Sequence, residues 1–449
     1  MSTVGASAHG AQAFVSLDDV VTRITTTPPT AQLAQFLRTF AQKETRDAVL
    51  ASTLGSGQDP LAVLDPVRNT LGYLFILSAR LQGSTLPSPP LSAIEDFCST
   101  FEPEQARLAP DRVTLLAKGI LRVAEQSANP KYAIRSLASL VARYPPSPSY
   151  LTTLHPIFVR VCVATGHYAS ALPVLSVPIT NVDTSVSDLT YNDHLVYHYA
   201  GGVALGALKR WREAEEFFEI CVSAPAQVPA AIQLEAFKKL ALVQLIQYGE
   251  TVPPPKYTLP ALVRIFKNTS YNTFIKNYPS TTAVLRTWVT KEADMLNTDQ
   301  NTGLVNQAIE RAPVWLIKKL TATYLTLGLS DIKKQAGIET VEQCRETILS
   351  MIDAGEINGS ISADDTVTFA DPVPEFSKDQ LDRLLVSAQH NSALLAETER
   401  ALNTSKEYLT KATKAKDDSG WGADEDMYGA NSMMGGSGHA PWADEVSFA

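Results

Sequence analysis

His194 and His198 have the spacing in this sequence that comes nearest to a metal site. They are four positions apart, so both would lie on one face of a helix, where they could bind zinc if a third ligand were close. The nearest candidate ligand is Asp193, which a helix directs to a different side. We therefore expect a pair of histidines on a helix face, with no metal and no cofactor.

Other residues capable of chemistry also lack the spacing that chemistry requires. The four cysteines are at least 59 positions apart, so no C-x-x-C pair exists, and we expect them to be small core residues. The cluster Gly201, Gly202 and Gly206 lies in a helical pattern rather than after a strand, which predicts close helix packing and not a phosphate loop. The sequence contains no H-E-x-x-H and no G-x-x-x-x-G-K motif. We expect a protein that is not an enzyme.

Composition and charge limit the remaining classes of protein. The 449 residues are 45% hydrophobic, which is enough for a large core, and the net charge of −9 disfavours a general nucleic-acid binder. The longest apolar stretches, residues 71–77 and 240–246, are far shorter than the ~20 residues of a membrane span. We expect a soluble intracellular protein with no membrane contact.

The first two thirds of the chain have the pattern of stacked helix pairs. We expect a flexible N-terminus over residues 1–25 and a helical-repeat array over 26–230. Three helix–turn–helix units are predicted at 111–144, 151–175 and 193–221, each with a small residue where its helices must approach: Ala133, Ala171 and Ala214. The third unit fits the tetratricopeptide pattern, because its packing residues have that spacing: Gly202, Leu205, Trp211, Ala214 and Phe218.

Residues 314–371 have the element order of a winged helix. A helical stripe at Leu316, Leu320, Tyr324 and Leu327 is followed by a short helix over 329–336 and by a third helix that Thr340 can cap. The alternating segments 356–361 and 366–369 then predict a β-hairpin, with Asp364 and Asp365 at its turn. We expect this hairpin to be the only substantial sheet.

The charge of this region argues against contact with DNA. Residues 330–371 contain nine acidic and three basic residues, and the third helix has Glu342, Glu346 and Asp353 against Arg345 alone. A surface of this sign repels phosphate, so we expect a protein contact and no nucleic acid. By contrast, residues 231–320 carry a net charge of +5, which is either an ordinary solvated surface or a charge step that orients partner subunits.

The C-terminal part is predicted to be one long helix followed by a disordered tail. Ser377 can cap a helix over 377–414, in which Leu381, Ala388, Leu395 and Leu402 recur every seven residues up to Leu409. The companion positions are mostly polar after Leu384, which favours a single helix entering a bundle of partner helices over a two-stranded coiled coil. Residues 415–449 are acidic and glycine-rich and are expected to be disordered.

Helical repeats followed by a winged helix resemble the PCI-domain family. Several segments are similar in particular to subunit three of the COP9 signalosome: residues 234–239, 255–257, 303–305, 320–331 and 351–357. The resemblance covers about residues 191–369 and places a PCI domain at 191–371, with its winged helix at 314–371. The expected fold class is therefore mainly α: a tetratricopeptide-like solenoid, a winged-helix module, a long C-terminal helix and a disordered tail.

This resemblance implies a non-catalytic scaffold subunit in cytoplasm and nucleus. That complex removes a ubiquitin-like modifier from cullins and so regulates cullin–RING ubiquitin ligases, with its isopeptidase centre in a separate metalloprotease subunit. The implied partners are other PCI-domain subunits, that metalloprotease subunit and, indirectly, the ligases. The alternatives are a PCI subunit of the proteasome lid or of initiation factor three, or a nucleic-acid-binding PCI protein of mRNA export.

Two sets of residues are the expected subunit interfaces. The first is the winged-helix hairpin, whose strand edge would pair with a neighbouring subunit: Glu356, Ile357, Ser360, Ile361, Thr366, Val367, Thr368 and Phe369. The second is the stripe of the C-terminal helix: Leu381, Leu384, Ala388, Leu395, Leu402 and Leu409.

Overall fold

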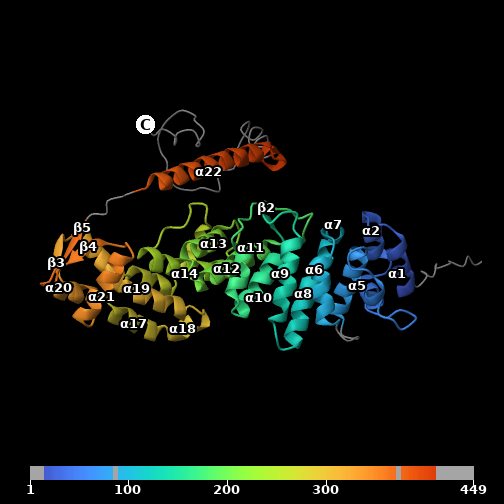
Figure 1. Cartoon of the computed structure of the whole chain (residues 1–449), viewed down its shortest axis with the longest axis horizontal. Coiled ribbons are helices and arrows are strands. Elements are labelled where there is room, and N and C mark those ends of the chain that lie inside the picture. The colour runs from blue at the N-terminus through green and yellow to red at the C-terminus, as the bar shows by residue number, and fades with distance from the viewer. Residues whose placement is uncertain (1–14, 84–88, 371–375, 411–449) are drawn as a thin grey trace, which may run out of the picture. The chain divides into compact units, whose positions relative to one another are not determined.

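The protein is helical along most of its length, as Figure 1 shows. The structure is a computed structural model, and it describes residues 15–83, 89–370 and 376–410. The predicted disordered tail at 415–449 lies outside these residues. The chain forms two compact units, which divide after Ala370. Within the described ranges, no helix is both long enough and apolar enough to cross a membrane.

The N-terminal helices surround one buried helix, α5, in which every side chain from Thr70 to Leu81 is buried. The elements here are α1 (Leu17–Thr26), α2 (Ala31–Thr39), α3 (Lys43–Leu50), α4 (Pro60–Val63), α5 (Thr70–Gln82), α6 (Leu91–Thr100) and α7 (Pro103–Arg107). The expectation of a flexible segment over residues 1–25 is wrong for α1. A capping box between Ser16 and Asp19 starts this helix, and Val20 and Ile24 anchor it in the core.

The three predicted helix pairs are present. They are α8 (Pro110–Gln126) with α9 (Tyr132–Arg143), α10 (Leu154–Ala164) with α11 (Tyr168–Leu175), and α12 (Tyr191–Ala207) with α13 (Trp211–Ser223). Ala133, Ala171 and Ala214 are fully buried, as their predicted role in close helix packing requires. A side chain at Gly202 would meet the ring of Phe218 at 2.7 Å, so this glycine serves packing.

The array continues through α14, which packs on both α13 and α19. The remaining helices are α14 (Ala231–Tyr248), α15 (Pro260–Lys267), α16 (Ser270–Lys276), α17 (Thr282–Lys291), α18 (Ala293–Thr298) and α19 (Thr302–Thr321). Lys238 and Lys239 of α14 are buried because polar partners meet their ammonium groups. Lys238 Nζ lies 2.9 Å from Asp299 Oδ2, and Lys239 Nζ lies 2.6 Å from Asn301 Oδ1.

The winged-helix module follows α19. It contains β3 (Thr326–Gly328), α20 (Leu329–Ala336), α21 (Val341–Asp353), β4 (Asn358–Ile361) and β5 (Thr366–Ala370). The Thr340 hydroxyl accepts the backbone N–H of Gln343 and caps α21 as predicted. Gly337, with φ of 66°, ends α20 in the left-handed region that favours glycine.

The sheet of this module differs from the predicted hairpin. Its strand order is β3-β5-β4, and both neighbours are antiparallel to β5. The predicted helical stripe through Leu327 is wrong at its end, because α19 stops at Thr321 and Leu327 lies in β3. A second sheet joins β1 (Tyr150–Leu151) to β2 (Asn181–Val182) over two residues each.

Two separate hydrophobic cores follow this division of elements. The large core extends from Leu17 to Trp315, and the core of the winged-helix module extends from Ile317 to Phe369. Both are therefore built within the first compact unit, and they meet along α19. The predicted domain boundaries at 230 and 191 have no counterpart in these cores and stay predictions.

The second unit contains α22 (Lys378–Thr404), which Ser377 caps as predicted with a capping box to Gln380. None of its side chains is buried. The single helix predicted over 377–414 is interrupted, because Ser405 has an extended backbone conformation. Residues 406–410 are helical again, so Leu409 lies beyond the interruption, and 411–414 lie outside the described residues.

Candidate interaction surfaces

The histidine pair of α12 is a packing feature rather than a metal site. The rings of His194 and His198 are 4.3 Å apart, and His198 packs against Phe217 and Tyr197. Burial lowers the pKa of His198 to about 4, and its Nδ1 lies 2.9 Å from the His194 carbonyl oxygen. Within the described part of the chain, no group of three His, Cys, Asp or Glu residues is placed to hold a metal.

The four cysteines are core residues, as predicted. Cys98, Cys162, Cys221 and Cys344 are all fully buried. Burial raises the pKa of the Cys162 and Cys344 thiols to about 11 and that of Cys221 to about 12. Protonated buried thiols are poor nucleophiles, so these residues supply volume and not reactivity.

The central strand of the winged-helix sheet is β5, and this changes which residues can meet a neighbour. Thr368 pairs with Ser360 of β4 on one side and with Thr326 of β3 on the other. A strand with partners on both sides has no free edge. The hairpin can therefore pair with another chain only through β4, or the sheet through β3.

The hydrogen-bonding pattern identifies the free groups of β4. Ser362 N donates to Thr366 O at 2.8 Å, which makes this a hydrogen-bonded pair of the ladder. Because such pairs alternate in antiparallel strands, Ser360 also bonds to β5, and the backbone groups of Gly359 and Ile361 face away from it. The outer edge of β4 therefore offers two N–H and two C=O groups.

Three residues predicted for the interface belong to the core instead. Ile357, Val367 and Phe369 are 6%, 0% and 5% exposed and pack with α20 and α21. Their apolar side chains must face inward because alternate residues of a strand point to opposite faces. The remaining members of that predicted set are exposed or half-buried: Glu356, Ser360, Ile361, Thr366 and Thr368.

An ion pair fixes the start of the hairpin to α19. Arg311 Nη1 lies 3.0 Å from Glu356 Oε1, and the guanidinium of Arg311 also lies 5.3 Å from the ring of Trp315. Glu356 is thus occupied by a contact within its own unit. This contact positions the start of the hairpin, and the role of Glu356 at a subunit interface stays a prediction.

The outer surface of α21 is acidic, as the sequence predicts. Glu342 and Glu346 are exposed, and Arg345, the basic residue of this helix, contacts Asp365 at the hairpin turn. The helix that would enter a DNA groove therefore presents carboxylates, which phosphate repels.

The stripe of α22 is exposed apolar surface. Leu381, Leu384, Leu395 and Leu402 are 47%, 56%, 69% and 57% exposed. At 3.6 residues per turn these positions, together with Ala388, lie within about 60° of one another around the helix. Leu385, which the heptad spacing omits, is also exposed and broadens this surface near its beginning, whereas the exposed Val386 lies on the opposite face of the helix.

Sequence reasoning missed two features. β3 has only three residues, and Leu327 continues the helical spacing that precedes it, so no local pattern identifies the strand. A pocket between α14, α15 and the loop 251–259 was also missed, because residues distant in the sequence form it. The absence of acidic residues over 251–291 was the one available signal for it.

Comparison with known proteins points to one family. The model of the N-terminal helical repeats of COP9 signalosome complex subunit 3 matches residues 32–262. A COP9 signalosome complex subunit 3 from Dictyostelium discoideum is 28% identical over 404 residues, which cover 87% of this chain and 94% of that protein. One from Drosophila melanogaster is 27% identical over 388 residues, covering 80% and 86%. Because the family model matches more than half of the 449 residues, the chain belongs to the family of COP9 signalosome complex subunit 3.

Proposed function

We propose that this protein is a non-catalytic scaffold subunit of the COP9 signalosome. In that role it contributes to the removal of a ubiquitin-like modifier from cullins, and so to the regulation of cullin–RING ubiquitin ligases. The observation that carries the proposal is the similarity along most of the chain to two proteins named as subunit 3 of that complex.

The proposed partners are other PCI-domain subunits and a separate metalloprotease subunit of the same assembly. Contact with cullin–RING ligases is indirect in this proposal, and the complex acts in cytoplasm and nucleus. The resemblance assigns bond cleavage to the metalloprotease subunit, so this chain supplies surfaces for assembly and no reacting group.

Strand pairing at the edge of the wing is the first proposed contact. Gly359 and Ile361 direct backbone donors and acceptors outward from β4, and an added strand would satisfy them. This proposal narrows the predicted hairpin interface to its β4 strand, where the side chain of Ser360 is exposed.

Helix packing by α22 is the second proposed contact. Its leucines would lose their exposure to water when partner helices cover the stripe, at about 25 cal/mol per Å² of apolar surface. A soluble helix seldom leaves so many large apolar side chains uncovered, so a partner surface explains the pattern. Leu409 belongs to this proposal only if the interruption at Ser405 closes on assembly.

Purification of the native assembly tests the proposed function. The full chain with an affinity tag would be isolated from its own cells and the accompanying proteins identified by mass spectrometry. We expect a set of PCI-domain subunits together with one metalloprotease subunit, in near-stoichiometric amounts. Recovery of the chain alone, or with proteasome-lid or initiation-factor subunits, would contradict the proposal.

A further inference from the structure

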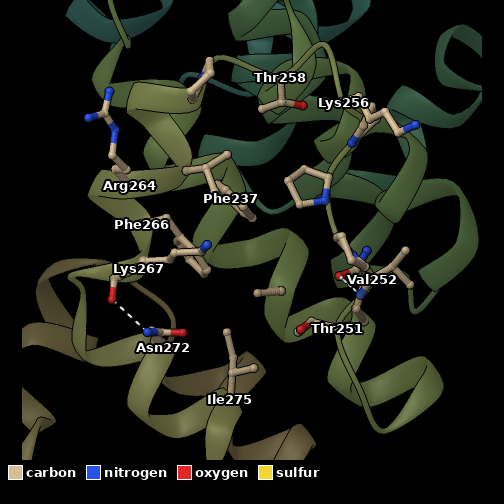
Figure 2. A pocket seen from close by; sticks show the side chains of 17 residues that line it. Phe237, Thr251, Val252, Lys256, Thr258, Arg264, Phe266, Lys267, Asn272 and Ile275 are labelled. Carbon is tan, nitrogen blue, oxygen red and sulfur yellow. Dashed lines mark hydrogen bonds between the residues drawn. The ribbon is translucent and has the colours of Figure 1, made fainter. Parts of the chain in front are cut away.

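A pocket of about 650 Å³ lies beside α14, outside both surfaces discussed above. Figure 2 shows the side chains that line it, with Phe237 and Phe266 on one side and Val252 and Thr251 of the loop on the other. Ile275 of α16 closes its lower end in this view. Its volume is within the range of roughly 300–1,000 Å³ that is typical of ligand pockets.

The pocket is apolar and held in shape by its own contacts. Phe237 of α14 and Phe266 of α15 stack with their ring centroids 4.0 Å apart. The side chain of Gln244 joins α14 to the loop, because its Oε1 accepts the N–H of Val252 at 3.1 Å. Its amide nitrogen donates to Glu215, so the glutamine is fixed from both sides. The loop is therefore held in place rather than free to fill the pocket.

The loop leaves polar and apolar groups without partners. Three consecutive prolines, 253–255, supply no backbone N–H, so this wall of the pocket has no backbone donors there to form hydrogen bonds within the loop. The side chain of Thr258 is 4% exposed, and its hydroxyl has no hydrogen-bond partner in the described part of the chain. At the same time the side chain of Val252, which lines the pocket, is 53% exposed.

The charge around the pocket has one sign. Residues 251–291 contain six basic residues and no acidic one. Three of the six line the pocket: Lys256, Arg264 and Lys267. No ion pair joins these three to a carboxylate among the described residues, and no acidic residue lines the pocket. The rim therefore offers uncompensated positive charge around an apolar interior.

We propose that this pocket binds a large apolar side chain presented by an acidic segment of a partner polypeptide. The apolar side chain enters between Phe266 and the proline loop, and the flanking carboxylates meet Lys256, Arg264 and Lys267. This site is separate from strand pairing at β4 and from the stripe of α22, and it does not depend on the proposed assembly role.

The lining favours a polypeptide over a nucleic acid. Nucleic-acid binding takes most of its affinity from phosphates along a continuous basic surface. Here the cations lie at the mouth of a hollow whose interior is formed by aromatic, aliphatic and proline side chains. Such an interior gains free energy from an apolar side chain removed from water, and the charges then select its acidic neighbours.

Fluorescence anisotropy with a defined probe tests the proposal. The probe is a fluorescein-labelled peptide with one tryptophan between three acidic residues on each side, titrated with the purified full chain. We expect saturable binding that weakens at least tenfold when the tryptophan is replaced by alanine. Equal binding of the alanine peptide would overturn the proposal, because charge alone would then account for the contact.

Matched variants separate the pocket from its surroundings. Val263→Trp fills the pocket and should weaken binding at least tenfold, whereas Ile265→Trp, on the exposed side of α15, should not. Arg264→Glu with Lys267→Glu should abolish binding of the peptide. The control, Lys276→Glu with Lys291→Glu, changes the net charge by the same amount outside the pocket and should retain most of the peptide affinity. Equal loss in both members of either pair would overturn the proposal. Circular dichroism on every variant checks that the fold is retained.

Two further experiments test for other occupants of the pocket. If single-stranded oligouridylate binds more tightly than the peptide, and the same pocket variants weaken that binding, the occupant is a nucleic acid and not a polypeptide. Trp421 and Trp442 of this chain also stand near acidic residues. If one of these tryptophans occupied the pocket, Trp421→Ala with Trp442→Ala in the full chain would increase the affinity for the peptide, and such an increase would contradict the assignment to a partner polypeptide. Unchanged peptide affinity would support that assignment.

Discussion

At the residue scale, two glycines show how the same backbone conformation can occur in a tightly packed site and in an open one. Gly249 ends α14 with φ of 78°, and a side chain there would meet the indole of Trp315 at 2.6 Å. Gly166, between α10 and α11, has φ of 73° but open space around it. The two glycines thus share the left-handed backbone and differ in what lies beside them.

Alanine at these two positions should separate backbone strain from steric overlap. Gly166→Ala should lower the free energy of unfolding by about 1 kcal/mol, the usual cost of a left-handed residue with a side chain. Gly249→Ala adds overlap with Trp315 and should cost roughly 2 kcal/mol more. Urea unfolding followed by circular dichroism measures both. Equal losses would show that Trp315 moves aside without cost.

His155 should make the stability of the protein depend on pH. It is 2% exposed, its Nδ1 accepts the N–H of Thr152 at 3.1 Å, and burial lowers its pKa to about 4. The unfolded state, with a pKa near 6.5, therefore binds more protons between pH 6.5 and 4. Its contribution to stability is complete above pH 6.5 and is lost as the pH falls through 4, by about 3 kcal/mol in total.

Replacement of His155 tests the predicted direction of this pH dependence. His155→Asn retains an acceptor for Thr152 N–H and cannot titrate, so unfolding measured from pH 8 to pH 4.5 should show a shallower fall in stability than in the unmodified chain. An unchanged slope would mean that other groups, such as the buried His198, dominate the pH dependence.

At the scale of elements, the sequence predicts helices well and sheet edges poorly. The pairs α8–α9, α10–α11 and α12–α13 follow from local spacing, because each needs a small residue at the crossing and a turn between two stripes. α1 was missed because its signal, the capping box at Ser16, follows fifteen residues without a pattern. The placement of β5 between β3 and β4 depends on Thr326, about 40 residues before Thr368, which no local pattern reveals.

The strand order leads to a prediction about proline in the wing. The Ile361 N–H faces outward, so Ile361→Pro removes a donor from the free edge of β4 and should weaken association with a neighbouring chain. The isolated protein should lose only about 1 kcal/mol, because the ladder with β5 is kept and some packing of Ile361 is lost. Co-purification of partner subunits with the tagged variant and thermal unfolding of the isolated variant measure the two effects.

Ser360→Pro is the matched control for this edge. Its N–H faces β5, so the same substitution one residue earlier breaks the ladder and should destabilise the module by roughly 1 kcal/mol beyond Ile361→Pro. Proline at Thr368 would act similarly, since β5 is central, and cannot test the interface. If Ile361→Pro left the assembly intact, the outer edge of β4 would have no partner.

At the scale of the whole molecule, charged residues and exposed apolar residues are concentrated in different regions, and these regions determine where other chains can bind. The winged-helix region 330–371 carries a net charge of −6, while residues 251–291 carry +6. Opposite charges on successive modules restrict the orientations in which a charged partner approaches. Exposed leucines are concentrated instead on α22, in the second unit.

The leucine stripe should decide whether the protein joins its assembly. Leu395→Asp with Leu402→Asp places two carboxylates at the centre of the proposed helix contact, where burial of an unpaired charge costs several kcal/mol. The tagged variant should therefore recover at least tenfold less of its partner subunits. Because both side chains are more than half exposed, the melting temperature of the isolated variant should change by less than ~2 °C.

Ala393→Asp with Thr404→Asp adds the same charge on the opposite face of α22 and should leave recovery of the partner subunits unchanged. Equal recovery with both double variants would mean that the stripe is not the contact, and that the outer edge of β4 must supply the specificity of assembly.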